Sequence, residues 1–300
     1  MTSGSGRNEA AAEVGIIGGS GIYALDALTD VRRVRVTTPY GDPSGELVLG
    51  ELAGTRVAFV PRHGEGHHIL PSRIPVRANI HALKSLGVRQ ILAVSAVGSL
   101  RADYAPGDLV VPDQLVDRTR VDRGSTFFDE DVVVHVAFAE PYCGRLRRSL
   151  VEAAGRATTA KVHESGTYCC MEGPQFSTRA ESELHRRLGF DLIGMTAIPE
   201  AKLAREAELC YASLCLVTDY DCWFDGHDDV TAHAVVEVMR RNSEAAKATL
   251  TTLLAKQPVD TDCACQHMLA TSINTSLENL PARAVERYGL LLGKYLPAGS

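Results

Sequence analysis

The stretch Val14-Gly15-Ile16-Ile17-Gly18-Gly19-Ser20-Gly21 predicts a short buried strand that ends in a glycine-rich turn. Glycines in such a turn let backbone N–H groups approach an anion, and Ser20 adds a hydroxyl donor. The turn is therefore suited to phosphate, although a simple tight turn would have the same local sequence.

Outward from this strand, apolar runs bounded by glycine alternate with helical patterns. Further strands are predicted at 47–52, 56–60, 90–95, 166–171, 191–195 and 211–218. Helices are predicted around 80–86, 146–157, 200–208, 230–256 and 281–292. Strands that alternate with helices imply a mixed or parallel sheet with helices on both faces. Because no repeat and no linker divides the chain, we expect one α/β domain over 14–300, with a central mixed β-sheet flanked by helices.

The two ends of the chain have a different composition. Residues 1–13 are rich in Gly, Ser and Ala, and we expect them to be disordered. From about 258 to 276 the chain is polar and turn-rich, which predicts a loop before the last helix. We find no signal peptide and no membrane span, so we expect a cytoplasmic protein without a membrane partner. The formal net charge of −6 argues against nucleic acid as a partner.

The eight cysteines would normally be free thiols in a cytoplasmic protein. No Cys-x-x-Cys pair indicates a redox or zinc-ribbon site. Cys263-Ala264-Cys265-Gln266-His267 is the one unusual cluster, and we interpret it as a pair of free thiols on a loop. Too few ligands converge in this segment for metal binding, so we expect no metal site.

Polar side chains at strand ends indicate where a site would lie. In open α/β sheets, ligands gather at the carboxyl ends of the strands. Five polar residues fall at or just past predicted strand ends: Ser20, His63, Ser95, Thr196 and Asp219. Together they are more informative than any one of them alone.

Several of these segments have the chemistry of a phosphate site. Arg62 offers a planar fork of donors for phosphate oxygens, and His63 can add a further donor. The three histidines within 63–68 are too irregularly spaced to suggest a metal, although an exposed loop with structural histidines remains the alternative. Ser95 and the backbone of Ala96 form another candidate corner, where the alternative is an ordinary turn.

Other segments have the chemistry of a nucleoside site. Phe176 has a flat face that could stack on a base, and Met195 offers a soft apolar contact to a sugar or a sulfur atom. Asp219 and Asp221 could point into one pocket if the chain bends after its strand, and a protonated carboxyl can donate to a purine nitrogen. Core packing for Phe176, a plain strand end at Met195 and a solvated acidic loop are the alternatives.

Taken in order, these segments resemble the methylthioadenosine phosphorylases of the trimeric purine nucleoside phosphorylase family. The motifs are Gly-Ile-Ile-Gly-Gly-Ser-Gly at 15–21, Arg-His-Gly at 62–64, Ala-Val-Gly-Ser at 96–99, Glu-Gly-Pro-Gln-Phe at 172–176 and Thr-Asp-Tyr-Asp-Cys-Trp at 218–223. The match runs from about 14 to 252. Chance can produce one such motif, but not five in this order.

The resemblance implies a role for each candidate residue. The phosphate site would comprise Ser20, Arg62, His63, Ser95, Ala96 and Thr196. Met195 would meet the ribose, and the base would lie near Phe176, Asp219 and Asp221. The family also implies a homotrimer or a dimer of trimers, in which His135 reaches a neighbouring subunit's pocket. Replacing Arg62 with alanine should then weaken phosphate use and spare the fold.

The implied reaction is the phosphorolysis of 5′-methylthioadenosine to adenine and 5-methylthioribose 1-phosphate, in purine and methionine salvage. Phosphate would attack C1′ from the face opposite the base. Asp219 would protonate N7, which requires a pKa raised by burial or by Asp221, and Asp221 would accept from the exocyclic amine. Inorganic phosphate is the co-substrate, and no cofactor is implied.

Three other activities share part of the pattern. A phosphorylase for 6-oxopurine nucleosides is disfavoured because such relatives usually carry asparagine at the position of Asp219. A nicotinamide-dependent dehydrogenase would use the glycine run at 19–24, but no acidic residue ends a second strand at the expected distance. A non-catalytic nucleoside-binding protein is disfavoured by the complete set of phosphate residues.

Two features depart from the family pattern. Many relatives have threonine where this chain has Ser20 and Ser95, a change that keeps the hydroxyl. The tail beyond about 258 is not part of the general pattern, although some heat-adapted archaeal relatives carry a C-terminal Cys-x-Cys. That likeness suggests such a source and disulfides involving Cys263 and Cys265, and Cys143 could also pair with Cys210. The sequence does not fix the connectivity.

Overall fold

Two long strands, β5 (Gln90–Ser99) and β11 (Cys210–Asp219), form the centre of the structure. They pair in parallel, with Cys210 opposite Gln90 and Asp219 opposite Gly98. Almost every residue of both strands is buried, as expected for parallel strands covered on both faces. The computed structural model describes residues 11–19, 27–224, 232–256 and 262–297.

One mixed sheet of eleven strands runs through the molecule, and its main order is β2-β3-β4-β1-β5-β10-β9-β7. β11 pairs with β5 and β6, and β6 also pairs with β8. The remaining strands are β1 (Val14–Gly18), β2 (Thr29–Val34), β3 (Leu47–Leu52), β4 (Thr55–Pro61), β6 (Leu109–Val110), β7 (Gln114–Asp117), β8 (Val162–His163), β9 (Thr167–Cys170) and β10 (Leu192–Gly194).

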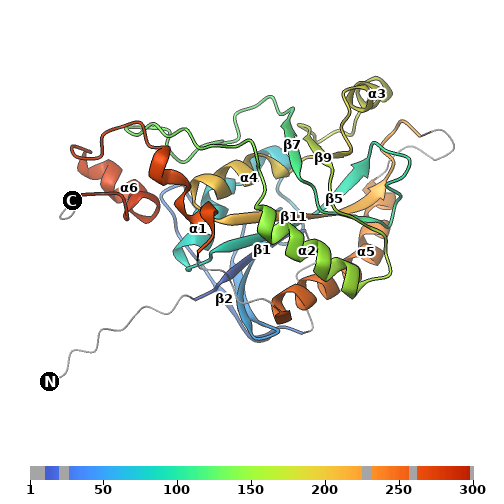
Figure 1. Ribbon diagram of the computed structural model, residues 1–300, viewed down its shortest axis with the longest axis horizontal. Helices are drawn as coiled ribbons and strands as arrows, with labels where there is room; N and C mark the ends of the chain where they lie inside the picture. Colours follow the sequence, from blue (N-terminus) through green and yellow to red (C-terminus); the bar gives the residue numbers. More distant parts are fainter. Residues whose placement is uncertain (1–10, 20–26, 225–231, 257–261, 298–300) are drawn as a thin grey trace.

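Helices cover both faces of the sheet (Figure 1). They are α1 (Val76–Ser85), α2 (Gly144–Ala157), α3 (Arg179–Arg187), α4 (Ala197–Glu206), α5 (Ala232–Lys256) and α6 (Ala282–Leu292), with 3₁₀ turns η1 (Pro71–Arg73) and η2 (Ala264–Thr271). Apolar residues of α1, α4 and α6 share one buried core, and those of α2 and α5 share a second. β1 lies between the two, because Ile17 belongs to the first core and Ile16 to the second. The predicted fold class is therefore confirmed.

Two parts of the sequence prediction need correction. The strand predicted at 90–95 continues to Ser99, because the β11 partner continues alongside and β10 pairs antiparallel with residues 98 and 99. Ser95 is therefore inside a strand and not at its end. The loop predicted from 258 to 276 contains η2, which buries Cys265 and Leu269. Residues 1–10 lie outside the described part, and Ala12 is already buried.

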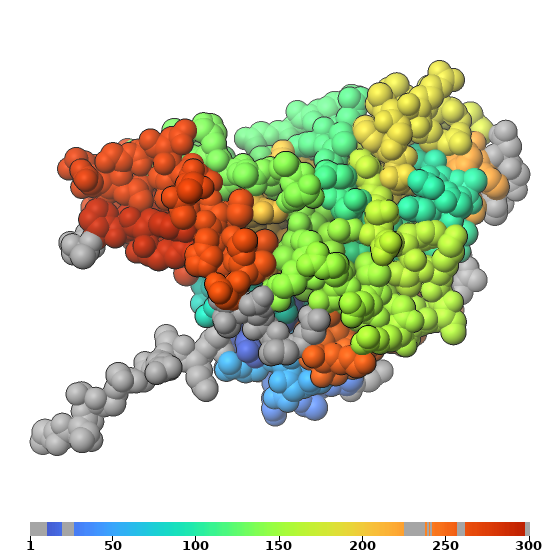
Figure 2. Space-filling view, viewed as in Figure 1, coloured from blue at the N-terminus to red at the C-terminus, as the bar shows by residue number. Residues whose placement is uncertain are grey.

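The C-terminal segment from 262 to 297 packs along a long connection, residues 129–140. The N–H of His135 donates to the carbonyl oxygen of Ser272 at 2.8 Å, and Val134 forms a bridge with Ile273. An ion pair between Arg283 and Asp131 adds to this contact. In Figure 2 the C-terminal segment forms a lobe at one end of the molecule, opposite α3.

Candidate active site

Two aspartates lie together where β11 ends. Asp221 has a positive φ of 51°, a conformation that aspartate tolerates better than most residues, and this bends the chain as the sequence argument required. The N–H of Asp221 donates to Oδ1 of Asp219 at 2.8 Å. Gly98 on β5 gives both side chains room, because a Cβ there would lie 2.9 Å from Oδ1 of Asp219 and 3.5 Å from Cβ of Asp221.

Burial raises the pKa of Asp219 above its ordinary value of 3.8, and the nearby carboxylate of Asp221 raises it further. Hydrogen bonds from Thr218 and from the Asp221 amide act in the opposite direction. Burial also raises the pKa of Asp221. Two close carboxyl groups in a partly dry site resist both being charged, so Asp219, whose pKa the Asp221 carboxylate raises, is the one disposed to keep a proton.

The hydroxyl of Thr218 lies within hydrogen-bond distance of the Asp219 carboxyl and can accept a hydrogen bond from its protonated form. Its Oγ1 is 2.7 Å from Oδ2 of Asp219 and 3.2 Å from the carbonyl oxygen of Val97. A hydroxyl has one hydrogen, so it cannot donate to both oxygens at once. If Asp219 carries a proton on Oδ2, that proton is donated to Thr218, which then donates to Val97. The arrangement accommodates a neutral Asp219.

The loop after β9 and the helix α3 that follows it form the other side of this carboxyl pair. The hydroxyls of Ser177 and Ser182 lie near Asp221 and lower its pKa against the effect of burial. The thiol of Cys222 donates to the carbonyl oxygen of Ser177 at 3.2 Å, which ties the two loops together. Phe176 is 43% exposed on the same loop, so it is not a core residue. Its ring remains available for stacking.

Arg62 is buried and makes a bidentate ion pair with Glu200. Its Nε and Nη2 lie 2.9 and 3.0 Å from the two carboxylate oxygens, and Nη1 donates to the carbonyl oxygen of Val94 at 2.8 Å. Burial works against the charge on Arg62, but Glu200 outweighs it and raises the pKa of the guanidinium. The fork predicted for phosphate is therefore closed by Glu200. Only the second N–H of Nη1 has no partner among the described residues.

His63 is neutral near pH 7. Burial lowers the pKa of its imidazole to about 4, and the nearby Arg62 and His67 contribute in the same direction. Nδ1 lies 2.9 Å from the carbonyl oxygen of Ile69, so the proton is assigned to that nitrogen. Nε2 is then an acceptor and not the donor that the sequence predicts, and it could accept from a protonated phosphate oxygen.

Ser95 and Thr196 come together through an antiparallel pairing. Leu192 lies opposite Ser99 and Ile193 opposite Gly98, so the chain after β10 runs back along β5. It reaches Ser95 at Thr196, where the two hydroxyl oxygens are 3.4 Å apart. Ala96 follows Ser95 in the same strand, two residues after Val94, whose carbonyl oxygen accepts from Arg62. Ser20 lies outside the described residues.

Met195 lies between the two halves of the site. Its side chain packs against Gly173, in the loop that carries Phe176. Its carbonyl oxygen accepts from Nη1 of Arg123 at 2.7 Å, and Arg123 also pairs with Glu172 at 2.7 Å. This network fixes the loop relative to the end of β10.

His135 does not join these residues. It is exposed, and its backbone pairs with the C-terminal segment instead. Within the described part of the chain, no contact links its side chain to the carboxyl pair or to Arg62. This position neither supports nor excludes a contact with another subunit.

Sequence reasoning missed the groups that support the site. In the sequence Glu200 marks only the start of a predicted helix, yet its carboxylate pairs with Arg62 and also accepts from the hydroxyl of Tyr211 at 2.8 Å. Arg123 lies in no motif that indicates its role. A buried acid beside a buried base is visible only in three dimensions, because Arg62 and Glu200 are 138 residues apart in the chain.

In the described residues, no helix has the length and apolar character needed to cross a bilayer.

Similarity to known proteins extends over nearly the whole chain. A sequence profile of the phosphorylase superfamily matches residues 13–255. S-methyl-5′-thioadenosine phosphorylase of Koribacter versatilis (strain Ellin345) is 52% identical over 285 residues, which are 95% of this chain and 97% of the relative.

Two solved structures share the fold. A methylthioadenosine phosphorylase from an antarctic soil metagenomic library has a TM-score of 0.89 at 46% identity, over 95% of this chain and all (100%) of the other. Methylthioadenosine phosphorylase of Schistosoma mansoni, in complex with adenine, has a TM-score of 0.82 at 37% identity, over 88% and 99%. The chain therefore belongs to the phosphorylase superfamily and, within it, to the family of S-methyl-5′-thioadenosine phosphorylases.

Proposed function

We propose that this chain splits 5′-methylthioadenosine with inorganic phosphate, giving adenine and 5-methylthioribose 1-phosphate. The observation that carries the proposal is the half-buried carboxyl pair of Asp219 and Asp221. A carboxyl with a raised pKa can hold a proton at neutral pH and give it to a leaving purine. The names of the relatives and the adenine bound to the Schistosoma mansoni enzyme support the choice of nucleoside.

The leaving group decides what the carboxyl pair must do. When the bond between C1′ and N9 breaks, the purine takes the electron pair, and protonation at N7 makes it a better leaving group. Asp219 is the proposed donor of that proton, and Asp221 accepts from the 6-amino group. Phe176 stacks on the base, and Met195 contacts the ribose.

The phosphate is proposed to lie beside Ser95, on the N-terminal side of Gly98 in β5. Ser95 and Gly98 are three residues apart in an extended strand, so the hydroxyls and the carboxyl pair are separated by roughly 10 Å. A ribose fits between groups at this spacing. Ser20, Ser95, Thr196 and the amide of Ala96 would donate to phosphate oxygens. The free N–H of Arg62 and Nε2 of His63 complete the proposed site.

This arrangement explains how the reaction would proceed without a cofactor. The phosphate anion stabilises positive charge that builds on the sugar ring, and then attacks C1′ with inversion. The positioning groups are held rigidly by the Glu200 and Arg123 networks. The products would enter purine and methionine salvage, and a cytoplasmic location suits that role.

A 6-oxopurine phosphorylase is the competing assignment. An oxygen at C6 only accepts hydrogen bonds, and so does the ionised carboxylate of Asp221. The two would repel each other, so the carboxyl pair favours an amino group at C6. A dehydrogenase is not favoured, because the chain belongs to the phosphorylase superfamily.

A direct assay tests the proposal. We expect adenine to be released from 5′-methylthioadenosine only when phosphate is present, with 5-methylthioribose 1-phosphate formed in equal amount. Inosine and adenosine are the comparison substrates, and phosphate-free buffer is the control. A higher kcat/KM for inosine than for 5′-methylthioadenosine would contradict the assignment.

We also propose that the chain works as a homotrimer or as a dimer of trimers. Several large apolar side chains are exposed on the loops beside the site, on the 129–140 connection and at α3, and an interface would cover them. They are Val121, Val133, Phe176, Leu184 and Leu188. His135 is exposed on the connection beside Val133, which is where a residue lent to a neighbour would lie.

Complementation between two defective variants tests this arrangement. If one subunit supplies Asp219 and its neighbour supplies His135, mixed assemblies of Asp219→Asn and His135→Ala chains contain some sites with neither defect. With random mixing in a ring, about one quarter of the sites are intact. Co-expression should therefore restore activity above that of either variant alone.

Sedimentation gives the size of the assembly in the same samples. The wild type should sediment as a trimer or a multiple of it. A fully active monomer, or mixed assemblies without any recovered activity, would contradict the shared site.

A further inference from the structure

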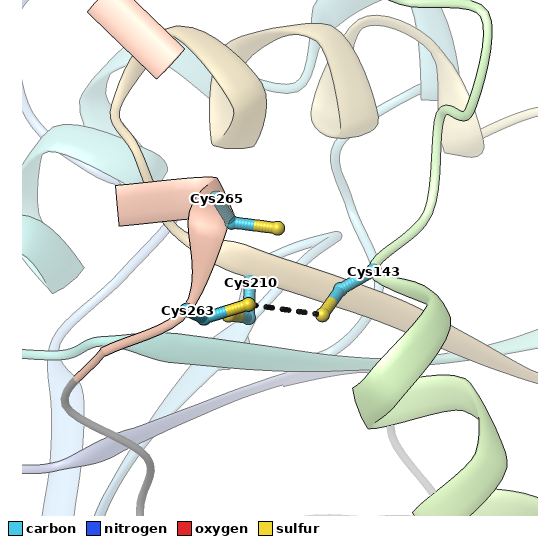
Figure 3. A group of neighbouring side chains, drawn as sticks. All are labelled: Cys143, Cys210, Cys263 and Cys265. Atoms are coloured by element: carbon cyan, nitrogen blue, oxygen red, sulfur yellow. Dashed lines mark hydrogen bonds between the residues drawn. The ribbon is translucent and has the colours of Figure 1, made fainter. Parts of the chain in front are cut away.

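Four cysteines from three separate parts of the chain lie together beside the sheet (Figure 3). Cys143 precedes α2, Cys210 is the first residue of β11, and Cys263 and Cys265 lie at the start of η2. Their sulfur atoms all lie within 4.8 Å of one another, and those of Cys143 and Cys263 are 3.8 Å apart. Three of the four are buried and Cys263 is half-buried.

We propose that these four thiols bind one zinc ion. Zinc prefers four ligands in a tetrahedron, and bonds of about 2.3 Å to sulfur place the sulfur atoms about 3.8 Å apart. The four side chains offer that number of ligands at close to that spacing. On binding, each thiol loses its proton, so one Zn²⁺ replaces four protons and the site carries two negative charges.

A zinc site accounts for the cluster better than disulfides do. A disulfide brings two sulfur atoms to about 2.05 Å and would divide four cysteines into separate pairs. All eight cysteines are free thiols here, and each of the four has three sulfur neighbours. Among the described residues, no other group of three or more His, Cys, Asp or Glu side chains converges in this way.

The backbone holds the ligands in place. The N–H of Cys143 donates to the carbonyl oxygen of Tyr211 at 2.8 Å, and the N–H of Cys210 donates to that of Arg89 at 3.0 Å. The carbonyl oxygen of Cys263 accepts from the N–H of Gln266 at 2.8 Å. Cys143 also lies at the N-terminus of α2, where the helix dipole favours a thiolate.

The surroundings suit a structural ion and not a catalytic one. The four cysteines belong to the apolar core shared by α2, α5 and the sheet, which limits access of water. A closed set of four protein ligands leaves no position for substrate. The segment 263–267 alone offers too few ligands, because Cys143 and Cys210 are distant from it in the chain. His267 is not a ligand, since it is exposed and lies 3.8 Å from Asp262.

The consequence of the ion would be mechanical. It would fasten η2 to the starts of α2 and β11, and so anchor the whole C-terminal segment. That segment pairs with residues 133–135, which include the proposed partner-contacting His135. The zinc proposal itself depends only on the cysteines and holds whatever the substrate is.

Metal content of the full-length protein tests the proposal. The reduced chain, purified without chelator, should contain about one zinc per chain. Replacing the ion with Co²⁺ should produce the intense visible bands of a tetrahedral thiolate site. In Cys263→Ala the zinc affinity, measured by competition with a chromophoric chelator, should fall at least about tenfold.

Cys169→Ala is the matched control, because Cys169 is buried but lies outside the cluster. It should keep its zinc. Three results would overturn the proposal: a disulfide between two of the four cysteines in the protein as purified, a reduced chain that does not take up zinc, or equal zinc affinity in Cys263→Ala and Cys169→Ala. Activity is not needed for any of these readouts.

Discussion

Replacing Asp219 with asparagine should lower kcat for 5′-methylthioadenosine by about 10²- to 10⁴-fold, the range that a positioned general acid contributes. Asparagine keeps the hydrogen bonds of the native side chain. Its oxygen can accept from the N–H of Asp221, and its NH₂ group can donate to Thr218, which then donates to Val97. Only the transferable proton is lost, so KM should change much less than kcat.

The choice of base should change in the same variant. An amide at this position can donate to a purine without giving up a proton, so a leaving group that needs less protonation suffers less. The ratio of kcat/KM for 5′-methylthioadenosine to that for inosine should therefore fall. Asp42→Asn, at an exposed aspartate, is the control and should leave the ratio unchanged. A variant of Asp219 with an unchanged ratio and normal kcat would remove the residue from the acid role.

The raised pKa of Asp219 also predicts how stability depends on pH. A folded-state pKa above the ordinary 3.8 means that the folded protein holds this proton more tightly than the unfolded chain. Stability from this group is complete below 3.8 and is lost as pH rises to the folded pKa. Asp219→Asn has no such loss, so urea unfolding at neutral pH should show it at least as stable as the wild type.

The parts of the fold that the sequence predicts well are those set by local pattern. β1 and β11 are continuous apolar runs because both of their faces are covered, and such runs can be recognised without a structure. The capping box of α3 is equally local, since Thr178 and Glu181 satisfy each other within one turn. The short strands β6 and β8, of two residues each, have no pattern to recognise.

The parts that sequence did not reveal depend on tertiary contacts. Nothing near Ser95 indicates that β10 runs antiparallel to β5 and so brings Thr196 beside it. Glu200, the partner of Arg62, is likewise far from it in the sequence. Residue type alone could say that Arg62 suits an anion, but only the structure shows that Glu200 already supplies one.

That ion pair leads to the second large expected effect. Arg62→Met should lower the free energy of unfolding by about 3–5 kcal/mol, because it leaves the carboxylate of Glu200 buried without its counter-charge. The side chains of Arg62 and Glu200 are only 3% and 2% exposed, so water cannot take the place of the missing partner. This corrects the expectation from sequence that the loss of Arg62 would spare the fold.

A second substitution separates the structural role of Arg62 from its proposed contact with phosphate. Arg62→Met combined with Glu200→Gln removes both charges but leaves an amide oxygen to accept from Tyr211. Most of the lost stability should return, since neutralising a buried pair is far less harmful than breaking it. Phosphate affinity should stay weakened in the double variant, because the remaining N–H of Arg62 is gone in both.

Unfolding in urea at one fixed chain concentration measures the first effect, and the dependence of initial rate on phosphate measures the second. Arg35→Ala is the matched control: its guanidinium is 79% exposed and pairs with Glu46 at the surface, so its loss should move the unfolding midpoint little. If the double variant were no more stable than Arg62→Met, the isolated charge on Glu200 would not be the cause. If it regained normal phosphate affinity, Arg62 would act only by holding the strand ends in place, and the phosphate would depend on Ser95, Thr196 and their neighbours alone.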